Sequence, residues 1–338
     1  MTEQSTGLFD NLRTREIASD RASAGAGPRH RRAGEERAAP AGRTKKFKLS
    51  LLRVLQPKKP TIYGRVGPLE VRLANGRTDL KLAQRLRYKV FYEEMSAKPS
   101  LTAQMRRRDH DRFDHVCDHL LVVDTSDMQR SANPLKVTPR PRVVGTYRIL
   151  RQDMIPPGRS FYTQTEYDIA PLLTAHRDTH RFMELGRSCV LKNYRNKRTV
   201  ELLWHGLWTY IRSHGVDVMM GCASFEGVNP DDHAMALSFL YHHRLAPEKW
   251  RVRAHDGLHV QMNLMPADQI DPRRALKALP PLIKGYLRLG AFVGDGAVID
   301  PQFGTTDVLI ILPVEAIDPR YFEHFGQPDE RESRISTG

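Results

Sequence analysis

The clearest hydrophobic pattern lies in the middle of the chain. Residues 181–191 form a short, mainly apolar run that is typical of a strand. After a basic turn at 193–198, apolar side chains recur at every third or fourth position between Thr199 and Gly215, which predicts an amphipathic helix. Thr199 suits the N-cap of this helix and Gly215 its end. The next apolar run, 216–225, predicts another strand, so this part of the chain alternates strand, turn, helix and strand.

Segments on both sides continue this alternation. The predicted elements are strands at 61–72, 119–124 and 143–150, a helix that begins at Thr78 and ends before Pro99, a polar loop at 126–142, a helix at 229–244, and one helix with two strands within 279–314. Strands and helices in such an order pack as layers, with helices covering a sheet. The order of elements therefore predicts an α/β domain with a mixed sheet.

Positive charge is concentrated near the start of the chain. The 338 residues carry a formal net charge of +14, and residues 1–60 contribute 14 Lys+Arg against 6 Asp+Glu. Between 19 and 41 large apolar residues are nearly absent, so we expect a disordered tail at 1–60. Within it, residues 45–56 suit a basic amphipathic helix on an anionic membrane, and a solvated tail explains the same cluster equally well. A second disordered tail is expected at 327–338.

Composition narrows the class of protein. No run approaches the ~20 apolar residues of a membrane-spanning helix, and the first 45 residues contain no apolar stretch of the kind found in signal peptides. The three cysteines, Cys117, Cys189 and Cys222, do not suggest a disulfide scaffold. The tail shows no recognised nucleic-acid-binding motif, so no nucleic-acid partner is expected. We expect a cytoplasmic protein, attached peripherally to the inner membrane if the tail helix forms.

The basic turn before the Thr199 helix is a candidate anion site. Backbone N–H groups at a helix N-terminus attract anions, and Arg195, Lys197 and Arg198 directly precede Thr199. The phosphate of coenzyme A or of a carrier-bound phosphopantetheine would fit such a site. A solvated loop that happens to be basic is the alternative interpretation.

Glu184 and Arg187 are a second candidate pair. Three residues apart on a straight strand, they would point to opposite faces, so a bulge or bend near Gly186 is needed to bring both into one pocket. Glu184 lies between Met183 and Leu185, and apolar surroundings raise the pKa of a carboxyl group. Such a group suits a general base acting on an ammonium nucleophile. A structural salt bridge between the two residues is the alternative.

The stretch 106–119 contains four aspartates, three histidines and one cysteine. Its spacing matches no zinc motif and its arginines would repel a cation, so no metal is expected. Acidic groups that bind a cationic substrate explain the same residues. Asp111 and Asp114 of this stretch and the distant Asp295 are the candidates for that role.

Seven motifs along the chain carry a resemblance to a known family. They are Arg87–Met95, Asp111–Asp114, Cys117–Val122, Gly145–Arg148, Glu184–Ser188, Gly221–Phe225 and Leu279–Ala291, the last continuing to Gly296. Together they resemble the acyl-carrier-using branch of the GNAT N-acyltransferases, and most closely the bacterial L-ornithine Nα-acyltransferases. The resemblance implies a GNAT-type mixed, mostly antiparallel twisted sheet flanked by helices over 61–326, with a C-terminal extension from about 266.

The chain also resembles the related acyl-homoserine lactone synthases, whose functional residues match positions here. In those enzymes a charged set orders the amino-acid pocket, and a glutamate is the proposed base. The implied pocket residues are Arg87, Phe91, Asp111, Asp114 and Arg148, and the implied catalytic residues are Glu184 and Arg187.

The donor site departs from the common GNAT pattern. Most GNAT enzymes hold the pyrophosphate of coenzyme A in a Gln/Arg-x-x-Gly-x-Gly/Ala loop, but the matching turn here, 195–200, has no glycine. A basic, glycine-poor turn suits an acidic carrier protein better. We therefore expect an acyl carrier protein thioester as co-substrate, bound at Arg195, Lys197, Arg198 and Thr199, and no bound cofactor.

The resemblance implies transfer of a (3-hydroxy)acyl group from acyl carrier protein to the α-amine of L-ornithine. The product would be lyso-ornithine lipid, the first intermediate of ornithine lipid synthesis. An acyl-homoserine lactone synthase or another N-acyl amino acid synthase is one alternative, although the block after Leu279 is absent from the shorter lactone synthases. A catalytically inactive GNAT domain that binds membrane or nucleic acid is the other.

Overall fold

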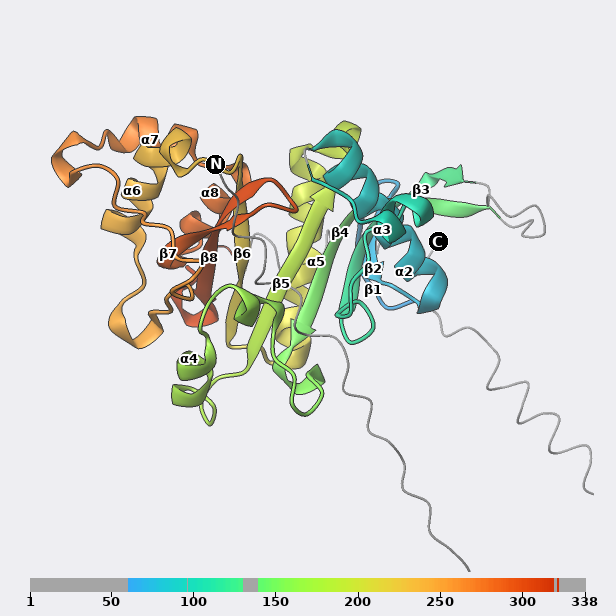
Figure 1. The fold of residues 1–338 in the computed structure, drawn as a ribbon. Helices are drawn as coiled ribbons and strands as arrows, with labels where there is room; N and C mark the ends of the chain where they lie inside the picture. The colour runs from blue at the N-terminus through green and yellow to red at the C-terminus, as the bar shows by residue number, and fades with distance from the viewer. Residues whose placement is uncertain (1–59, 96, 130–138, 319–320, 322–338) are drawn as a thin grey trace, which may run out of the picture. The chain divides into compact units, whose positions relative to one another are not determined.

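The computed structural model describes residues 60–95, 97–129, 139–318 and 321 (Figure 1). The expected helix at 45–56 and the expected tail at 327–338 lie outside these residues, as does nearly all of 1–60. Within the described ranges, no helix combines the length and the apolar character needed to cross a membrane.

The described strands form one sheet of eight. They follow the order β1-β2-β3-β4-β5-β6-β8-β7 across the sheet. β5 and β6 run parallel, and the other neighbouring pairs are antiparallel, which confirms the mixed, mostly antiparallel sheet. The strands are β1 (Ile62–Val66), β2 (Leu69–Leu73), β3 (Asp118–Gln129), β4 (Arg140–Arg151), β5 (Phe182–Val190), β6 (Val218–Glu226), β7 (Phe292–Asp300) and β8 (Thr305–Pro313).

Helices flank this sheet and connect its strands (Figure 1). The α-helices are α2 (Gly76–Tyr88), α3 (Leu101–Arg106), α4 (Ala170–Ala175), α5 (Lys197–His214), α6 (Ala234–Arg244), α7 (Pro272–Ala278) and α8 (Pro281–Arg288). The shorter helical segments are η1 (Lys89–Glu94), η2 (Gln152–Met154), η3 (Tyr162–Thr165), η4 (Lys192–Tyr194), η5 (Pro230–His233), η6 (Glu248–Trp250), η7 (Ala267–Gln269) and η8 (Val314–Ala316).

α5 and α2 cover opposite faces of the sheet (Figure 1). Leu203 of α5 packs where a side chain on Gly145 of β4 would begin. Arg87 of α2 binds the same carboxylate, Asp114, as Arg148 of β4. Positions 145 and 148 point to opposite faces because side chains alternate along a strand. We call these faces the α5 face and the α2 face.

The core has two apolar clusters. The larger one includes Leu120, Leu207 and Trp208 and packs α5 against the sheet. The smaller one includes Phe182 and Trp250 and lies on the α2 face, under the segment that joins β4 to β5. Together they hold the central strands in place on both sides of the site described below.

The start of α5 differs from the expected one. Asn196 caps the helix, because its side-chain oxygen accepts a hydrogen bond from the Thr199 N–H at 3.0 Å. Thr199 is buried in the first turn. Both residue types cap helices, and apolar periodicity does not locate a helix end to within three residues. The end at Gly215 is confirmed, with φ at +58°.

Other boundaries also shift. The strand expected at 61–72 is two strands, β1 and β2, joined by a turn at Gly67 with φ at +57°. The helix expected from Thr78 begins at Gly76 and continues beyond Tyr88 as the π-helix η1. The loop expected at 126–142 is shorter, because β3 and β4 extend into it from both sides.

β5 and β6 pair over only three residues before they separate. Phe182–Glu184 lie beside Val218–Met220, although both strands continue further. Gly221 lies at the point of separation, where an added Cβ would be 2.2 Å from the Leu185 carbonyl oxygen. Only glycine allows the two backbones to approach this closely before they part.

Candidate active site

A cavity of about 590 Å³ lies where β5 and β6 diverge. Side-chain alternation divides its wall into two halves. The α2-face half contains Arg148, Glu184, Cys222, Ser224 and Asp307, and the α5-face half contains Tyr147, Leu185, Met219, Ile310 and Leu312 together with Leu282 and Tyr286 of α8. One half is therefore polar and charged, and the other is apolar.

A β-bulge brings Glu184 and Arg187 to the same cavity. Arg148 pairs with Gly186 and Thr146 with Cys189, so β5 carries one extra residue here. Arg187 adopts φ at +51°, a left-handed conformation that is uncommon outside glycine. The bend expected near Gly186 is thus confirmed, and both side chains line the cavity.

Glu184 is buried and bonds to the η3 turn. Its Oε1 accepts hydrogen bonds from Thr163 N at 2.6 Å and Thr163 Oγ1 at 2.5 Å, and its Oε2 accepts one from Tyr162 N at 3.0 Å. Burial raises the pKa of Glu184, although these hydrogen bonds act in the opposite direction. The carboxylate forms hydrogen bonds to a turn rather than a salt bridge to Arg187.

Two arginines and three aspartates form a buried Arg–Asp network (Arg87, Asp109, Asp111, Asp114 and Arg148). Arg87 Nε lies 2.8 Å from Asp109 Oδ2, and Arg87 Nη2 lies 2.7 Å from Asp114 Oδ2. Arg148 Nη1 lies 2.6 Å from Asp111 Oδ2 and 3.4 Å from Asp114 Oδ1. Burial opposes ionisation, but the arginines outweigh it and lower the pKa of Asp111 and Asp114. These charges largely satisfy one another.

Arg187 and three aromatic rings lie between this network and the cavity. The Arg187 guanidinium carbon is 4.3 Å from the centre of the Phe303 ring and 5.4 Å from that of Tyr162, which indicates cation–π contact. Phe91 packs edge-on against Phe303 at 5.7 Å. Arg187 also lies 3.5 Å from Asp111. Phe91 and Arg187 therefore belong to the same wall of the cavity.

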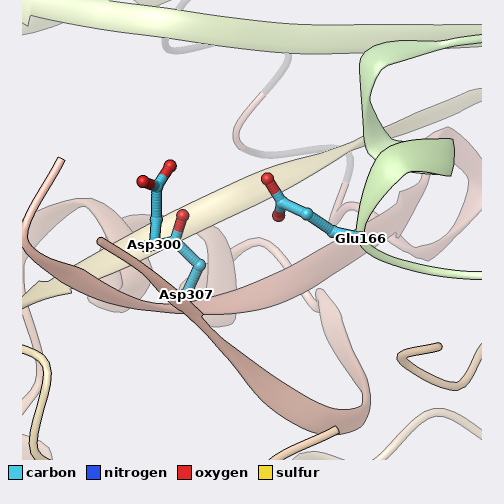
Figure 2. Close-up of side chains that lie close together, drawn as sticks. All are labelled: Glu166, Asp300 and Asp307. Atoms are coloured by element: carbon cyan, nitrogen blue, oxygen red, sulfur yellow. The ribbon is translucent and has the colours of Figure 1, made fainter. Parts of the chain in front are cut away.

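Three further carboxylates form an acidic trio on this wall (Glu166, Asp300 and Asp307). One oxygen of each lies within 4.8 Å of the others. Figure 2 shows Glu166 reaching from the segment after η3 toward Asp300, the last residue of β7, and Asp307, the third residue of β8. Burial raises the pKa of Glu166 to about 7 and that of Asp307 to about 6. Within the described part of the chain, this is the group whose ligand atoms lie close enough together to hold a metal ion.

The basic turn lies at the open end of the split between β5 and β6. Arg195 lines the cavity, and its Nη2 lies 2.5 Å from Glu94 Oε2 of η1. Lys197 and Arg198 are exposed, with Lys197 3.6 Å from Glu201. Thr199, one of the four expected anion-binding residues, is buried, and its N–H donates a hydrogen bond to Asn196. The other three are exposed.

Asp295 lies away from the other expected pocket residues. It is outside the described residues that line the cavity, and its Oδ2 lies 3.0 Å from Arg253 Nη1. His259 lies 3.7 Å from its other oxygen. The expectation that Asp295 contacts the substrate ammonium does not fit this position, because the strand places its carboxylate beside its own cationic partners.

Asp109 and the acidic trio are residues that the sequence interpretation did not select. Asp109 is one of four aspartates in 106–119 that local pattern does not distinguish. Asp300 ends the first of the two strands expected within 279–314 and Asp307 is the third residue of the second, so the available signal was a pair of acids close to a hairpin turn. Glu166 follows η3 in a segment with little hydrophobic periodicity.

Comparison of the sequence with known proteins finds related acyltransferases. A family model described as an acetyltransferase (GNAT) domain matches residues 86–205. A protein of Brucella abortus named L-ornithine N(alpha)-acyltransferase is 51% identical over 270 residues, covering 80% of this chain and 93% of its own length. A protein of Rhizobium meliloti with the same name is 51% identical over 265 residues, covering 78% and 86%.

Solved structures resemble the chain more distantly. FeeM, an N-acyl amino acid synthase from uncultured soil microbes, is 9% identical with a TM-score of 0.41, covering 76% of this chain and 93% of its own. MesI, a CoA-dependent acyl-homoserine lactone synthase, is 14% identical with a TM-score of 0.36, covering 74% and 89%. The protein is an enzyme of the acyltransferase class, and the chain belongs to the family of L-ornithine Nα-acyltransferases.

Proposed function

We propose that this protein transfers a (3-hydroxy)acyl group from acyl carrier protein to the α-amine of L-ornithine. The names of its relatives support ornithine as the acceptor. The observation that carries the proposal is a cavity whose charged half and apolar half meet at the β5 bulge. An amino acid matches the first half and an acyl chain the second. The product would be the lyso-lipid that begins ornithine lipid synthesis.

The acceptor would lie on the α2 face, beside Glu184 and Arg187. Arg187 offers a positive group for the α-carboxylate, held by its contacts with Phe303 and Tyr162. The Arg–Asp network fixes the wall behind it. Glu184 would lie close to the α-amine, because it lines the same half of the cavity.

The acyl group would pass directly from the thioester to the α-amine, without an acyl-enzyme intermediate. The neutral α-amine attacks the thioester carbon, a C–N bond forms, the C–S bond breaks, and the departing phosphopantetheine thiolate finally takes up the proton that the amine nitrogen loses. Glu184, directly or through water, would accept the proton lost by the amine. Residues 187 and 188 lie between the paired positions of β4 and β5, so their backbone N–H groups suit the developing oxyanion.

An acyl-enzyme on cysteine is not part of this proposal. Burial raises the pKa of Cys189 to about 12, and it raises that of Cys222 well above its ordinary value. A thiol is a good nucleophile only as thiolate. Neither side chain is therefore suited to carry the acyl group.

The proposal that acyl carrier protein is the donor rests on the basic surface at the open end of the split between β5 and β6. Glu93 and Glu94 are neighbours on η1, and they pair with Arg107 and Arg195 respectively. These two exposed arginines therefore both contact one short helical segment, and exposed Lys197 follows Arg195 closely in the sequence. Such a surface favours an acidic protein partner.

The test is purified enzyme supplied with acyl carrier protein or coenzyme A thioesters and with ornithine, lysine or glutamine. Mass spectrometry is expected to find N-acyl ornithine, formed faster from the carrier protein. An acyl-homoserine lactone as product, or transfer from coenzyme A alone, would contradict the proposal. No thioester consumption at all would favour a non-catalytic binding module.

The role of Glu184 is tested by Glu184→Gln beside Thr163→Val. Loss of a general base lowers kcat by about 10²–10⁴-fold, so Glu184→Gln is expected to fall in that range. Thr163→Val removes one hydrogen bond to the same carboxylate and keeps the base, so we expect a loss of less than about tenfold. Equal losses in the two variants would mean that Glu184 acts only by holding the η3 turn.

We place the enzyme in the cytoplasm, at the inner surface of the membrane. The basic segment 45–56 would attach it there, close to where an amphiphilic product partitions. A variant that lacks residues 1–45 is expected to keep most of its turnover. Complete loss of turnover in that variant would show that the tail serves catalysis.

A further inference from the structure

We infer that the acidic trio binds the side-chain ammonium group of the amino-acid acceptor and thereby selects a diamino acid over a neutral one. The inference rests on the proposed function and adds a subsite to it. The subsite is separate from Glu184, which has its own hydrogen-bond partners on η3.

Two members of the trio each have a buried oxygen atom without a hydrogen-bond partner, although Cys222 lies beside Glu166 and the hydroxyls of Ser224 and Thr305 lie beside Asp307. Within the described part of the chain, Glu166 Oε2 and Asp307 Oδ1 are buried and have no hydrogen-bond partner. The two residues are only 7% and 6% exposed. Buried polar atoms are nearly always paired, and leaving a carboxylate oxygen unpaired is costly. This concentration of unused acceptors indicates a ligand that donates hydrogen bonds.

The trio lies at the level of the β5 bulge. Glu184 pairs with Met220, and two residues further along each strand are Gly186 and Cys222. Asp307 of β8 lies beside Ser224, the next β6 residue on the same face. Figure 2 shows the carboxylates pointing toward one another from two sides. A short amino acid with its α-amine at the bulge therefore has its side chain within reach of the trio.

Arg187 supplies the opposite charge next to this group. Its guanidinium lies over the ring of Phe303, and Phe303 belongs to the turn between Asp300 and Asp307. Arg187 Nε is also buried without a hydrogen-bond partner among the described residues. A positive group for the α-carboxylate and a negative group for the side-chain ammonium thus lie on the same wall, linked through the turn that carries Phe303.

The chemistry of the trio fits an ammonium group. An ammonium has three N–H donors, and the trio presents one acceptor oxygen from each of three carboxylates. Asp300 Oδ1 already accepts hydrogen bonds from Gln302 N and Phe303 N, so the turn that carries Phe303 is tied to one of the three acids. A cation that joins the trio would also relieve the repulsion among its members, which contributes to the raised pKa of Glu166.

The experiment compares L-ornithine with L-norvaline, which has the same carbon chain without the amine. We would measure kcat/KM for both acceptors in the wild type, in Asp307→Asn and in Glu166→Gln, with Asp256→Asn as an exposed control. The wild type is expected to prefer ornithine at least 100-fold. Each trio variant is expected to reduce that preference to below tenfold, and the control to keep it. Two variants on different segments guard against the misfolding of either.

Calorimetry with each amino acid, without acyl donor, separates this inference from the proposed function. If the wild type acylates ornithine but the trio variants keep its preference, the subsite is wrong and the function stands. If the wild type acylates no ornithine, the function fails; ornithine binding that Asp307→Asn abolishes would still support the subsite, and absence of binding would overturn it. Stoichiometric Mn²⁺ binding that Asp307→Asn removes, with activity lost in EDTA, would overturn it in favour of a metal site.

Discussion

Two groups of buried acids lie on the same face of the sheet and differ in what surrounds them. In the Arg–Asp network each aspartate has an arginine within 3.4 Å, and the pKa of Asp114 is lowered. In the acidic trio, none of the ion pairs formed by the described residues includes Glu166 or Asp307, and the pKa values of both are raised. The first arrangement stabilises the fold by itself. The second lowers the stability of the free enzyme and gains its partner only with substrate.

The largest expected effect comes from breaking the Arg–Asp network. Arg87→Met leaves Asp109 and Asp114 buried without their main counter-ion, so we expect the free energy of unfolding to fall by about 3–5 kcal/mol. Urea denaturation measures this loss. The control Lys197→Met removes a charge from an exposed pair and should change the same quantity by less than about 0.5 kcal/mol. A loss below about 1 kcal/mol for Arg87→Met would mean that the network is not structural.

The trio should make the free enzyme less stable as the pH rises. Glu166 keeps its proton up to about pH 7 in the folded state, against an ordinary pKa of 4.5. The folded state therefore binds more protons in this window, and the stability that Glu166 contributes is greatest below pH 4.5 and is lost as the pH rises through 7. The contribution is about 1.4 kcal/mol per pH unit, or about 3 kcal/mol in total.

Urea denaturation at pH 5 and pH 8 measures this dependence. Glu166→Gln cannot ionise, so its stability is expected to vary less between the two pH values. The network has the opposite sign and a lower window, because the lowered pKa of Asp114 gives stability that is lost only as the pH falls below about 4. Equal slopes for wild type and Glu166→Gln would contradict the assignment.

Ornithine should supply the partner that the trio lacks. At 100 times its dissociation constant, a ligand that binds only the folded state stabilises it by about 2.7 kcal/mol. We expect ornithine to raise the Tm of the wild type, and the same concentration to raise that of Asp307→Asn far less. Norvaline serves as the control ligand. A Tm shift that is the same for both proteins would place the ornithine ammonium elsewhere.

The smallest expected change in stability differs in sign between the acidic trio and the Arg–Asp network. Without ligand at pH 8, Asp307→Asn removes one of three mutually repelling charges, so we expect unchanged stability or a gain of about 1 kcal/mol. Asp114→Asn removes a paired charge and should destabilise the protein. Denaturant midpoints of the two variants give the comparison directly. Destabilisation by both would show that the trio is as well satisfied as the network.

The local sequence pattern was sufficient to predict the strand and the helix that surround the site. The strand expected at 181–191 and the helix ending at Gly215 are present because apolar periodicity and a left-handed cap act over a few neighbouring residues. The bend near Gly186 followed from a chemical demand that Glu184 and Arg187 share one pocket. The cap at Asn196 was missed because Asn and Thr serve equally well at a helix start.

The local sequence pattern does not predict which charged side chains pair when they lie far apart in the sequence. Glu166 meets Asp300 and Asp307 only because β8 lies next to β6 and the η3 turn folds over the same face. Asp295 was selected, with Asp111 and Asp114, as an acid that could hold the substrate ammonium, and its ion pair with Arg253 depends on a contact between distant segments. A single sequence does not reveal which acids will find an arginine and which will remain unpaired.

The short pairing of β5 with β6 has a mechanical consequence. Three residue pairs join one part of the sheet, β1 to β5, to the other, β6 to β8, so a ligand can lie between the two parts without breaking a ladder. A long acyl amide that fills the gap would contact both parts of the sheet, and its departure would require the gap to widen. Turnover would then depend on how readily the gap beside Gly221 widens as well as on the chemistry next to it.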